Sequence, residues 1–295
     1  MADDDKGHNG LMDRLTRWLP ARLRRVPVVP VVRLSGTIGA VTPLRPGLSL
    51  AGVTKILERA FAIRNAKAVA LVINSPGGSP VQSRQIYARI RQLADERKIP
   101  VLVFVEDVAA SGGYMIACAG DEIFCDPSSI LGSIGVVGGS FGFQDLIKKV
   151  GIERRLYTSG EHKATLDPFL PENPDDVARL KAIQSDIHDT FIALVKRSRG
   201  ARLRGDDSFL FSGEYWAGEK ALSLGLADEI GDLRTVLRAR YGKEVQMPVI
   251  APPSGLLSNV IGKKPGAGAL VSASGFPDEL ISALESRAIW ARYGL

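Results

Sequence analysis

The chain has 295 residues, of which 45% are hydrophobic and 24% charged, and this composition leaves little room for global disorder. Its length suits one large domain or two smaller ones, and we favour one domain with appendages. The formal net charge of +6 would suit a nucleic-acid partner, but arginines near the N-terminus carry the excess, so we predict no nucleic-acid binding.

Residues 1–27 are predicted to be a basic amphipathic N-terminal segment. From Leu11 to Arg25, leucines and Trp18 recur at helical spacing opposite the arginines, a pattern typical of a helix at a membrane surface. Peripheral membrane contact and docking on the protein itself both stay open. The acidic start and the absence of a long apolar run predict neither a signal peptide nor a transmembrane helix. We expect the chain in the cytoplasm or on the cytoplasmic face of the inner membrane.

The first predicted elements alternate strand and helix. Val26 to Leu34 is β-rich but contains two prolines, which favours a strand at the edge of a sheet. A helix is predicted from Leu50 to Ile63 and a buried strand from Ala68 to Ile73. That strand ends in the turn 74–78, which contains Gly77 and Gly78.

A second unit repeats this plan. The helix after the first turn begins with Ser79 as its N-cap and Gln82 completing a capping box. A buried strand follows from Val101 to Val105, and 106–110 are expected to leave the sheet before the turn 111–113 and another helix. Since both turns follow parallel strands at the same end, we expect them to face one cleft.

The rest of the chain is predicted to be mainly helical. The predicted strands are Asp121 to Asp126 and Arg154 to Thr158, and the predicted helices are Gln144 to Val150, a long helix capped by Asn173, Glu214 to Leu224 and Leu233 to Arg240. A Pro/Gly/Ser-rich linker (242–277) and a C-terminal helix (278–295) follow.

No cofactor or metal is predicted. The glycines between Ile130 and Gly142 match neither the G-x-G-x-x-G motif nor the P-loop of nucleotide-binding proteins. The histidines are too scattered in the sequence to suggest a metal site. Cys118 and Cys125 are the only cysteines in the sequence, and we interpret both as buried apolar residues.

Ser111 is the candidate nucleophile. The NH of Gly112, together with an NH of Gly77 or Gly78, would form an oxyanion hole beside it. A serine next to two glycines is more often simply part of a tight turn, and the second glycine turn improves the case for catalysis. His8 and His188 are poor candidates for the base. His162 and its neighbour Lys163 stay open, since a lysine can replace histidine in such a site, although a loop lysine is usually just solvated.

Three motifs then point to a known family. The segments INSPGGSP, VAASGGYMIACAGDEIFCDPSSILGSIGV and YTSGEHKATLDPF resemble those of the signal peptide peptidase A family, serine proteases of the Clp-protease and crotonase fold. The similarity runs from about Val28 to Tyr241, so a peptidase domain is expected over 28–241. The motifs occur in the family's order, and the Ser111 to Lys163 spacing (163 − 111 = 52) is of the family's size.

The resemblance implies an α/β spiral of strand-strand-helix units and a Ser-Lys dyad. Ser111 matches the nucleophile, Lys163 the general base and Ser133 the serine that holds the lysine amine. Gly78 and Gly112 match the oxyanion hole, with Gly77 adjacent. Single-domain members of the family form ring-like octamers in which the two dyad residues come from neighbouring subunits, so a homo-oligomer is expected. They are commonly anchored by an N-terminal transmembrane helix, from which this sequence departs.

The expected function is therefore hydrolysis of short or unfolded peptides, including signal-peptide remnants. Two alternatives stay open at this point. One is an acyl-CoA hydratase or isomerase of the same fold, since a fold does not fix a function. The other is a catalytically inactive scaffold associated with the membrane.

Overall fold

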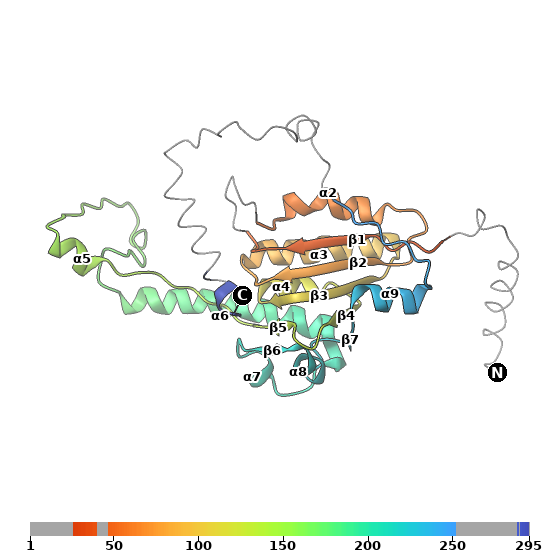
Figure 1. Cartoon of the computed structure of the whole chain (residues 1–295). Helices are drawn as coiled ribbons and strands as arrows, with labels where there is room; N and C mark the ends of the chain where they lie inside the picture. Colours follow the sequence, from red (N-terminus) through yellow and green to blue (C-terminus); the bar gives the residue numbers. More distant parts are fainter. Residues whose placement is uncertain (1–25, 40–46, 252–287, 289, 295) are drawn as a thin grey trace, which may run out of the picture.

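The computed structural model describes residues 26–39, 47–251, 288 and 290–294 (Figure 1). The predicted amphipathic helix near the N-terminus, most of the 242–277 linker and most of the C-terminal helix lie outside these residues. A seven-stranded, mainly parallel sheet in the order β1-β2-β3-β4-β7 forms the centre, and β5 and β6 extend it from β3. The strands are β1 (Val31–Ser35), β2 (Val69–Ser75), β3 (Val101–Ala110), β4 (Glu122–Cys125), β5 (Ile130–Gly132), β6 (Tyr215–Ala217) and β7 (Glu229–Ile230). The predicted α/β class is confirmed.

Helices follow most of the strands. They are α2 (Leu50–Phe61), α3 (Pro80–Arg97), α4 (Gly112–Ala117), α5 (Gln144–Lys149), α6 (Pro174–Arg199), η2 (Gly200–Arg202), α7 (Asp207–Leu210), α8 (Gly218–Ser223) and α9 (Leu233–Tyr241). Within the described ranges, no helix combines the length and the apolar character needed to cross a membrane.

Successive side chains along each strand point to opposite faces of the sheet, and this produces two cores, one on each face. In β2, Leu71 and Ile73 belong to the larger core, which α2, α3, α4 and α6 help to build, while Ala70 and Val72 face the smaller core with Leu237 of α9. A strand covered on both faces reads as a continuous apolar run, which is why β2 was recognisable in the sequence. Burying each large aliphatic side chain contributes about 1.5–3 kcal/mol.

Strand β3 is longer than predicted, and the expectation that 106–110 leave the sheet is wrong. The first half of β3 pairs with β4, up to Val105 opposite Cys125. Its second half pairs with β5, so that Ala110 lies opposite Gly132. Because β5 replaces β4 as the neighbour of β3, the strand stays paired up to Ala110, and Ser111 follows it directly.

Two further predictions are corrected by strand pairing. Residues 154–158 are not a strand, because they are exposed and no described strand lies beside them to pair with. The predicted helix 214–224 begins instead as β6, which runs antiparallel to β5 and places Trp216 opposite Leu131. Only its second half is helical.

The start of the predicted linker is part of the sheet region. The NH of Val29 donates to the carbonyl of Gln246 at 2.8 Å, and the NH of Ile250 donates to the carbonyl of Val31 at 2.9 Å. Residues 246–250 therefore run along the free edge of β1, and the folded domain extends beyond the predicted boundary at 241. The remaining linker residues, 252–277, lie outside the described residues.

The helix caps are partly as predicted. Asn173 caps α6 by accepting from the NH of Asp175, and Ser79 caps α3 by accepting from the NH of Gln82. The predicted capping box is wrong in its second half, because Gln82 Oε1 accepts from the NH of Leu50 at 2.9 Å. Gln82 thus joins the N-terminal ends of α2 and α3, which fixes the loop between β2 and α3.

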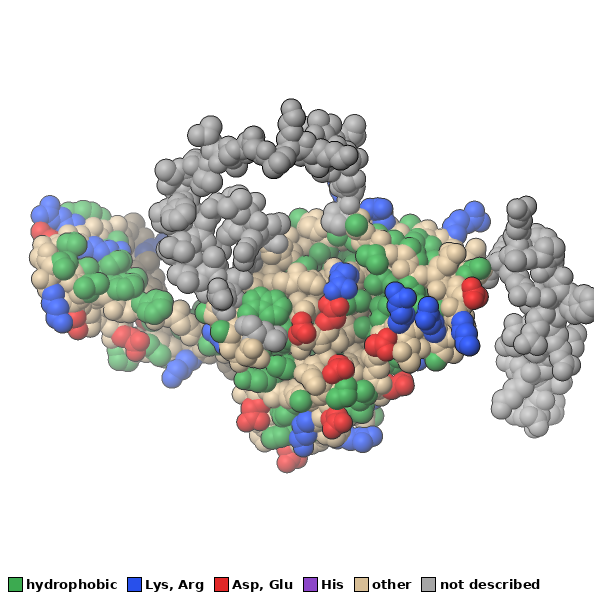
Figure 2. All heavy atoms as spheres, viewed as in Figure 1, with side chains coloured by type: hydrophobic (Ala, Val, Ile, Leu, Met, Phe, Trp, Pro, Cys, Tyr) green, Lys and Arg blue, Asp and Glu red, His purple; other side chains and the backbone are tan. Residues whose placement is uncertain are grey.

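Residues 138–187, which we call the arm, stand away from the sheet. Figure 1 shows α5 and the N-terminal half of α6 projecting from the body, whereas Phe191, Leu194 and Val195 in the other half of α6 are buried against it. Large hydrophobic side chains are nevertheless exposed on the arm, and Figure 2 shows them gathered there. They are Phe141, Phe143, Leu146, Val150, Ile152, Leu156, Tyr157, Leu170 and Ile183.

Candidate active site

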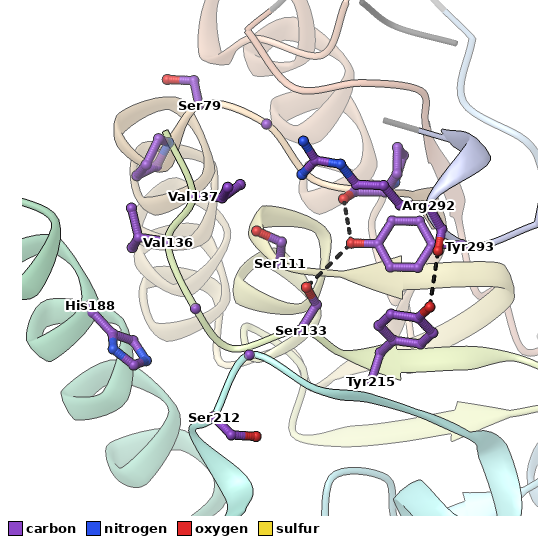
Figure 3. Close-up of a pocket in the computed structure, with 15 residues that line it drawn as sticks. Ser79, Ser111, Ser133, Val136, Val137, His188, Ser212, Tyr215, Arg292 and Tyr293 are labelled. Carbon is purple, nitrogen blue, oxygen red and sulfur yellow. Dashed lines mark hydrogen bonds between the residues drawn. The ribbon is translucent and has the colours of Figure 1, made fainter. Parts of the chain in front are cut away.

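A pocket of about 950 Å³ lies where β2 and β3 end (Figure 3). Gly78 from the first glycine turn and Ser111 from the second both border it. The expectation that the two turns face one cleft is therefore confirmed. The other side of the pocket is formed by Ser133 after β5, His188 of α6 and Tyr215 of β6.

Ser111 has a backbone conformation that few residues with a side chain adopt. Its φ is 52° and its ψ is −122°, which costs on the order of 1–3 kcal/mol for a residue other than glycine. The surrounding hydrogen bonds hold this conformation, because the Ser111 NH donates to the Gly132 carbonyl at 2.8 Å and the Ser111 carbonyl accepts from the Met115 NH at 3.0 Å. The hydroxyl makes no capping bond to α4, so it is free to act as a nucleophile.

Glycines are required where the two turns meet. A Cβ on Gly77 would lie 2.8 Å from the Cβ of Ser111 and 2.9 Å from the Gly112 nitrogen. A Cβ on Gly113 would lie 2.4 Å from the Ser75 carbonyl oxygen. All three distances are too short for a side chain at Gly77 or Gly113, so the glycines allow the backbones of the turns to pack directly against each other.

The amide groups of these turns differ in what they bind. The Gly77 NH donates to Ser75 Oγ at 3.3 Å. Among the described residues, the NH groups of Gly78 and Gly112 donate to no protein acceptor. Gly78 is exposed and Gly112 begins α4, so both donors are left for a ligand oxygen beside Ser111.

Ser133 is brought next to Ser111 by strand register. Since Ala110 pairs with Gly132, the residues that follow them, Ser111 and Ser133, leave the sheet side by side. The Ser133 NH donates to the Glu214 carbonyl at 2.6 Å, which ties Ser133 to the turn before β6. Figure 3 shows its hydroxyl directed to Tyr293, with the two oxygens 3.3 Å apart.

Lys163 is not brought to the pocket. It lies in the arm, its side chain is exposed, and its NH donates to the Gly160 carbonyl at 3.2 Å. The described part of the chain offers its amine no hydrogen-bond or ion-pair partner. The single chain thus assembles the serines and the glycines but leaves the predicted base apart from them.

Histidine does not replace the lysine. His162 lies in the arm beside Lys163 and is exposed. His188 borders the pocket, but its Nε2 is 3.0 Å from the Ile134 carbonyl, and no hydrogen bond joins it to Ser111 in the described structure. No group of three or more His, Cys, Asp or Glu side chains that could hold a metal is formed by the described residues.

Tyr215 and Tyr293 border the pocket, although no pattern in the sequence predicted them there. Tyr215 was assigned to a helix, and only its pairing in β6 directs it to the pocket. Tyr293 is 160 positions from Ser133, and no local signal in the sequence indicates that these residues meet. Contacts of this kind depend on the fold as a whole.

A buried ion pair supports the helix that follows Ser111. The Arg199 guanidinium, 1% exposed, donates to both oxygens of Asp228 at 2.7 and 2.9 Å and to the Gly225 carbonyl at 2.9 Å. Burial raises the pKa of the Asp228 carboxyl, but the bonds and charge of Arg199 outweigh it, and the pKa is lowered. Nearby, Tyr114 of α4 donates to the Leu226 carbonyl at 2.9 Å. The base of α4 is therefore fixed.

The comparisons with known proteins give one family match and several similar proteins. Residues 94–246 match peptidase family S49. A putative protease of Synechocystis is 30% identical over 225 residues, which are 73% of this chain and 80% of that protein. A membrane-bound stomatin-specific protease of known structure is 20% identical, with a TM-score of 0.48, and the match covers 78% of this chain and all of that one.

A further relative is a longer protein. It is described as the Na(+)/H(+) antiporter NhaA of Brucella abortus and is 56% identical over 291 residues, which are 95% of this chain. The match covers 39% of that protein, so the chain spans well under half of its length. Most of the protein that carries the antiporter name therefore lies outside the match.

Proposed function

Because this chain belongs to peptidase family S49, we propose that it is a serine endopeptidase that hydrolyses short or unfolded peptides with a Ser-Lys dyad. One observation carries the proposal. The strained Ser111 turn borders a pocket with an uncommitted hydroxyl, next to the uncommitted NH groups of Gly78 and Gly112. A nucleophile beside two fixed donors is the arrangement that acyl transfer requires.

The chemistry would proceed through an acyl-enzyme. The neutral amine of Lys163 takes the proton of the Ser111 hydroxyl as its oxygen attacks the peptide carbonyl carbon. The NH groups of Gly78 and Gly112 donate to the resulting oxyanion. The C–N bond then breaks, and the protonated lysine gives its proton to the leaving amine. Water, deprotonated by the same lysine, hydrolyses the ester, while Ser133 keeps the amine in position.

Lys163 would come from a second copy of the chain. Its side chain is exposed on the arm and does not border the pocket of its own chain. The arm also exposes a set of hydrophobic side chains, including Phe141 at 78% and Tyr157 at 89%, that isolated soluble proteins usually cover. Docking of one copy's arm near another copy's pocket would cover this surface and complete the dyad. In a closed ring, such as the octamer implied by the family resemblance, every pocket would receive a lysine from a neighbouring copy.

The substrate class follows from the shape of the site. Val136, Val137 and Tyr215 give the pocket an apolar wall, and an extended peptide would reach Ser111 more readily than a folded chain. Hydrophobic signal-peptide remnants fit this description. Such remnants are released at the inner membrane. Peripheral contact through Leu11 to Arg25 would place the chain on the cytoplasmic face of that membrane, close to this substrate.

A peptide library tests the activity. The purified chain is incubated with mixed synthetic peptides, and the products are identified by mass spectrometry beside those of Ser111→Ala and Lys163→Ala. We expect cleavage by the native chain and none by either variant, with the oligomer mass unchanged. Full activity in either variant would refute the dyad. Labelling of Ser111 by a fluorophosphonate separates a peptidase from an inactive scaffold, and binding of acyl-CoA thioesters would indicate the hydratase alternative.

A further inference from the structure

Two residues far from Ser133 in the sequence border the pocket. Arg292 and Tyr293 border it together with Ser111 and Ser133 (Figure 3). The Tyr293 hydroxyl is 3.3 Å from Ser133 Oγ and 3.4 Å from the Pro76 carbonyl oxygen. These contacts join Tyr293 to the first glycine turn and to Ser133.

Tyr215 holds the same segment from the other side. Its hydroxyl donates to the Arg292 carbonyl at 3.0 Å, and its ring meets the Tyr293 ring edge-on with the centroids 5.0 Å apart. Edge-to-face pairs of this kind are favourable beyond the area they bury. A hydrogen bond to the backbone of Arg292 and a ring contact with Tyr293 thus hold this segment at the pocket.

The position of Tyr293 conflicts with the proposed dyad. To be held by Ser133, the amine of Lys163 must approach its hydroxyl to about 3 Å. The phenol of Tyr293 already lies at that hydroxyl, and Tyr293 borders the pocket that a peptide would enter. A lysine amine cannot take the position of that phenol while Tyr293 is there, because packed groups do not interpenetrate.

We propose that the C-terminal residues 290–294 are an autoinhibitory strap: Tyr293 on Ser133 excludes Lys163 of the neighbouring copy, and the dyad forms only when the strap leaves. This inference rests on the proposed roles of Ser133 and Lys163. The strap is built to be displaced, since the Tyr293 hydroxyl makes two long, uncharged hydrogen bonds. Peptide substrate and the neighbouring arm compete with it for the same pocket.

The activity test uses the full chain with single substitutions. Tyr293→Phe removes the hydroxyl and keeps the ring, while Tyr293→Ala removes both. We expect the rate of cleavage of a fluorogenic peptide to rise about 2- to 10-fold in Tyr293→Phe, the range of one neutral hydrogen bond, and further in Tyr293→Ala. Tyr87→Phe is the matched control and keeps the native rate, since the hydroxyl of Tyr87 bonds to nothing in the described structure. Native rates in both Tyr293 variants would overturn the proposal.

A second comparison shows whether the effect passes through Ser133. In a Ser133→Ala background, the Tyr293 hydroxyl keeps only its bond to the Pro76 carbonyl, so adding Tyr293→Phe is expected to raise the residual rate less than it does in the native background. An increase as large as in the native background would mean that Tyr293 acts elsewhere, and would overturn the competition at Ser133.

The strap can also be measured without catalysis. In a Ser111→Ala background, trypsin cuts after Arg292 only when the strap leaves the pocket, and mass spectrometry reports the loss of residues 293–295. We expect Tyr293→Ala to speed this cleavage several-fold relative to the unsubstituted strap. Equal rates would overturn the strap. Faster trypsin cleavage in a protein that hydrolyses no peptide in any form would support the strap and refute the proposed peptidase instead.

Discussion

Ser111 borders the pocket at the end of β3, whereas Lys163 lies on the arm with an exposed side chain and does not border that pocket. The two residues belong to parts of the chain that meet only through α6 and the segment after β5. The proposed dyad therefore requires an oligomer in which each active site takes its serine from one copy and its lysine from another.

Mixing two inactive variants tests this statement. Ser111→Ala retains the lysine and Lys163→Ala retains the serine, so a mixed oligomer contains some sites with both native residues. After dissociation and reassembly in equal amounts, roughly a quarter of the native peptidase rate should return, because each site draws its two residues from different subunits. The rate is measured with a fluorogenic peptide. A mixture as inactive as its components would place both residues in one copy.

The exposed hydrophobic side chains of the arm are expected to hold the oligomer together. Ile152, 59% exposed, is a suitable position, since Ile152→Asp would put a charge into an interface without disturbing the core of the chain. We expect a smaller particle in light scattering after gel filtration and a loss of activity in parallel. Val81→Asp makes the same change at a residue 61% exposed outside the arm and should keep the native mass. An unchanged mass in Ile152→Asp would exclude this face as the contact.

Gly78 is expected to tolerate no side chain. A Cβ there would lie 2.1 Å from the Ile38 carbonyl oxygen, and the residue has a φ of +140°. Gly78→Ala must displace the loop and with it the proposed oxyanion donor, whose loss typically costs about 100- to 1000-fold in kcat. Gly52 of α2 is the control site, because a Cβ added there would approach only Ser49 Oγ, at 3.3 Å, and Gly52→Ala should keep native kinetics. Native kinetics in Gly78→Ala would remove Gly78 from the site.

Asp228 is expected to stabilise the fold strongly. Asp228→Asn would leave the buried Arg199 charge without its partner, which costs about 3–5 kcal/mol in the free energy of unfolding. Glu153→Gln breaks the exposed pair with Arg155 and should change stability by less than about 1 kcal/mol. Denaturant titration measures both. A change in Asp228→Asn as small as in Glu153→Gln would contradict the account of this pair.

The same pair predicts an acid limit of stability. Because the pKa of Asp228 is lowered in the folded protein, unfolding takes up a proton once the pH falls below the unfolded value of about 3.9. The stabilisation is complete above that pH and is lost as the pH falls through the folded pKa. Asp228→Asn should therefore show a weaker dependence of stability on pH in this acid range than the native chain.

Both cysteines are expected to resist thiol reagents while the chain is folded. Burial first of all raises the pKa of Cys118 to about 12 and that of Cys125 to about 11, and the thiolate is the reactive form. Ellman's reagent should find no reactive thiol at pH 8 until denaturant is added, and iodoacetamide should not reduce peptidase activity. Since these pKa values are raised, stability should fall as the pH rises from about 8.5 toward them. Rapid labelling of the native protein would contradict the buried placement.

Local signals in the sequence determined the strand β2, the caps Ser79 and Asn173, and the two glycine turns with Ser111. Each depends on residues within a few positions of one another: a continuous apolar run, a side chain that bonds the next turn of its own helix, or a glycine where the backbone turns. The order of the three motifs also carried the family resemblance that the match to peptidase family S49 bears out.

Only the tertiary structure decided how these pieces meet. The extension of β3 to Ala110, the conversion of 215–217 into β6 and the placing of Ser133 beside Ser111 all result from pairing with β5, whose partners are distant in the sequence. The contact of Tyr293 with Ser133 joins residues 160 positions apart. Such contacts are chosen by the packing of the whole chain and leave no local pattern, which is why the sequence indicated a nucleophile and its glycine donors but neither Tyr215 nor Tyr293 at the pocket.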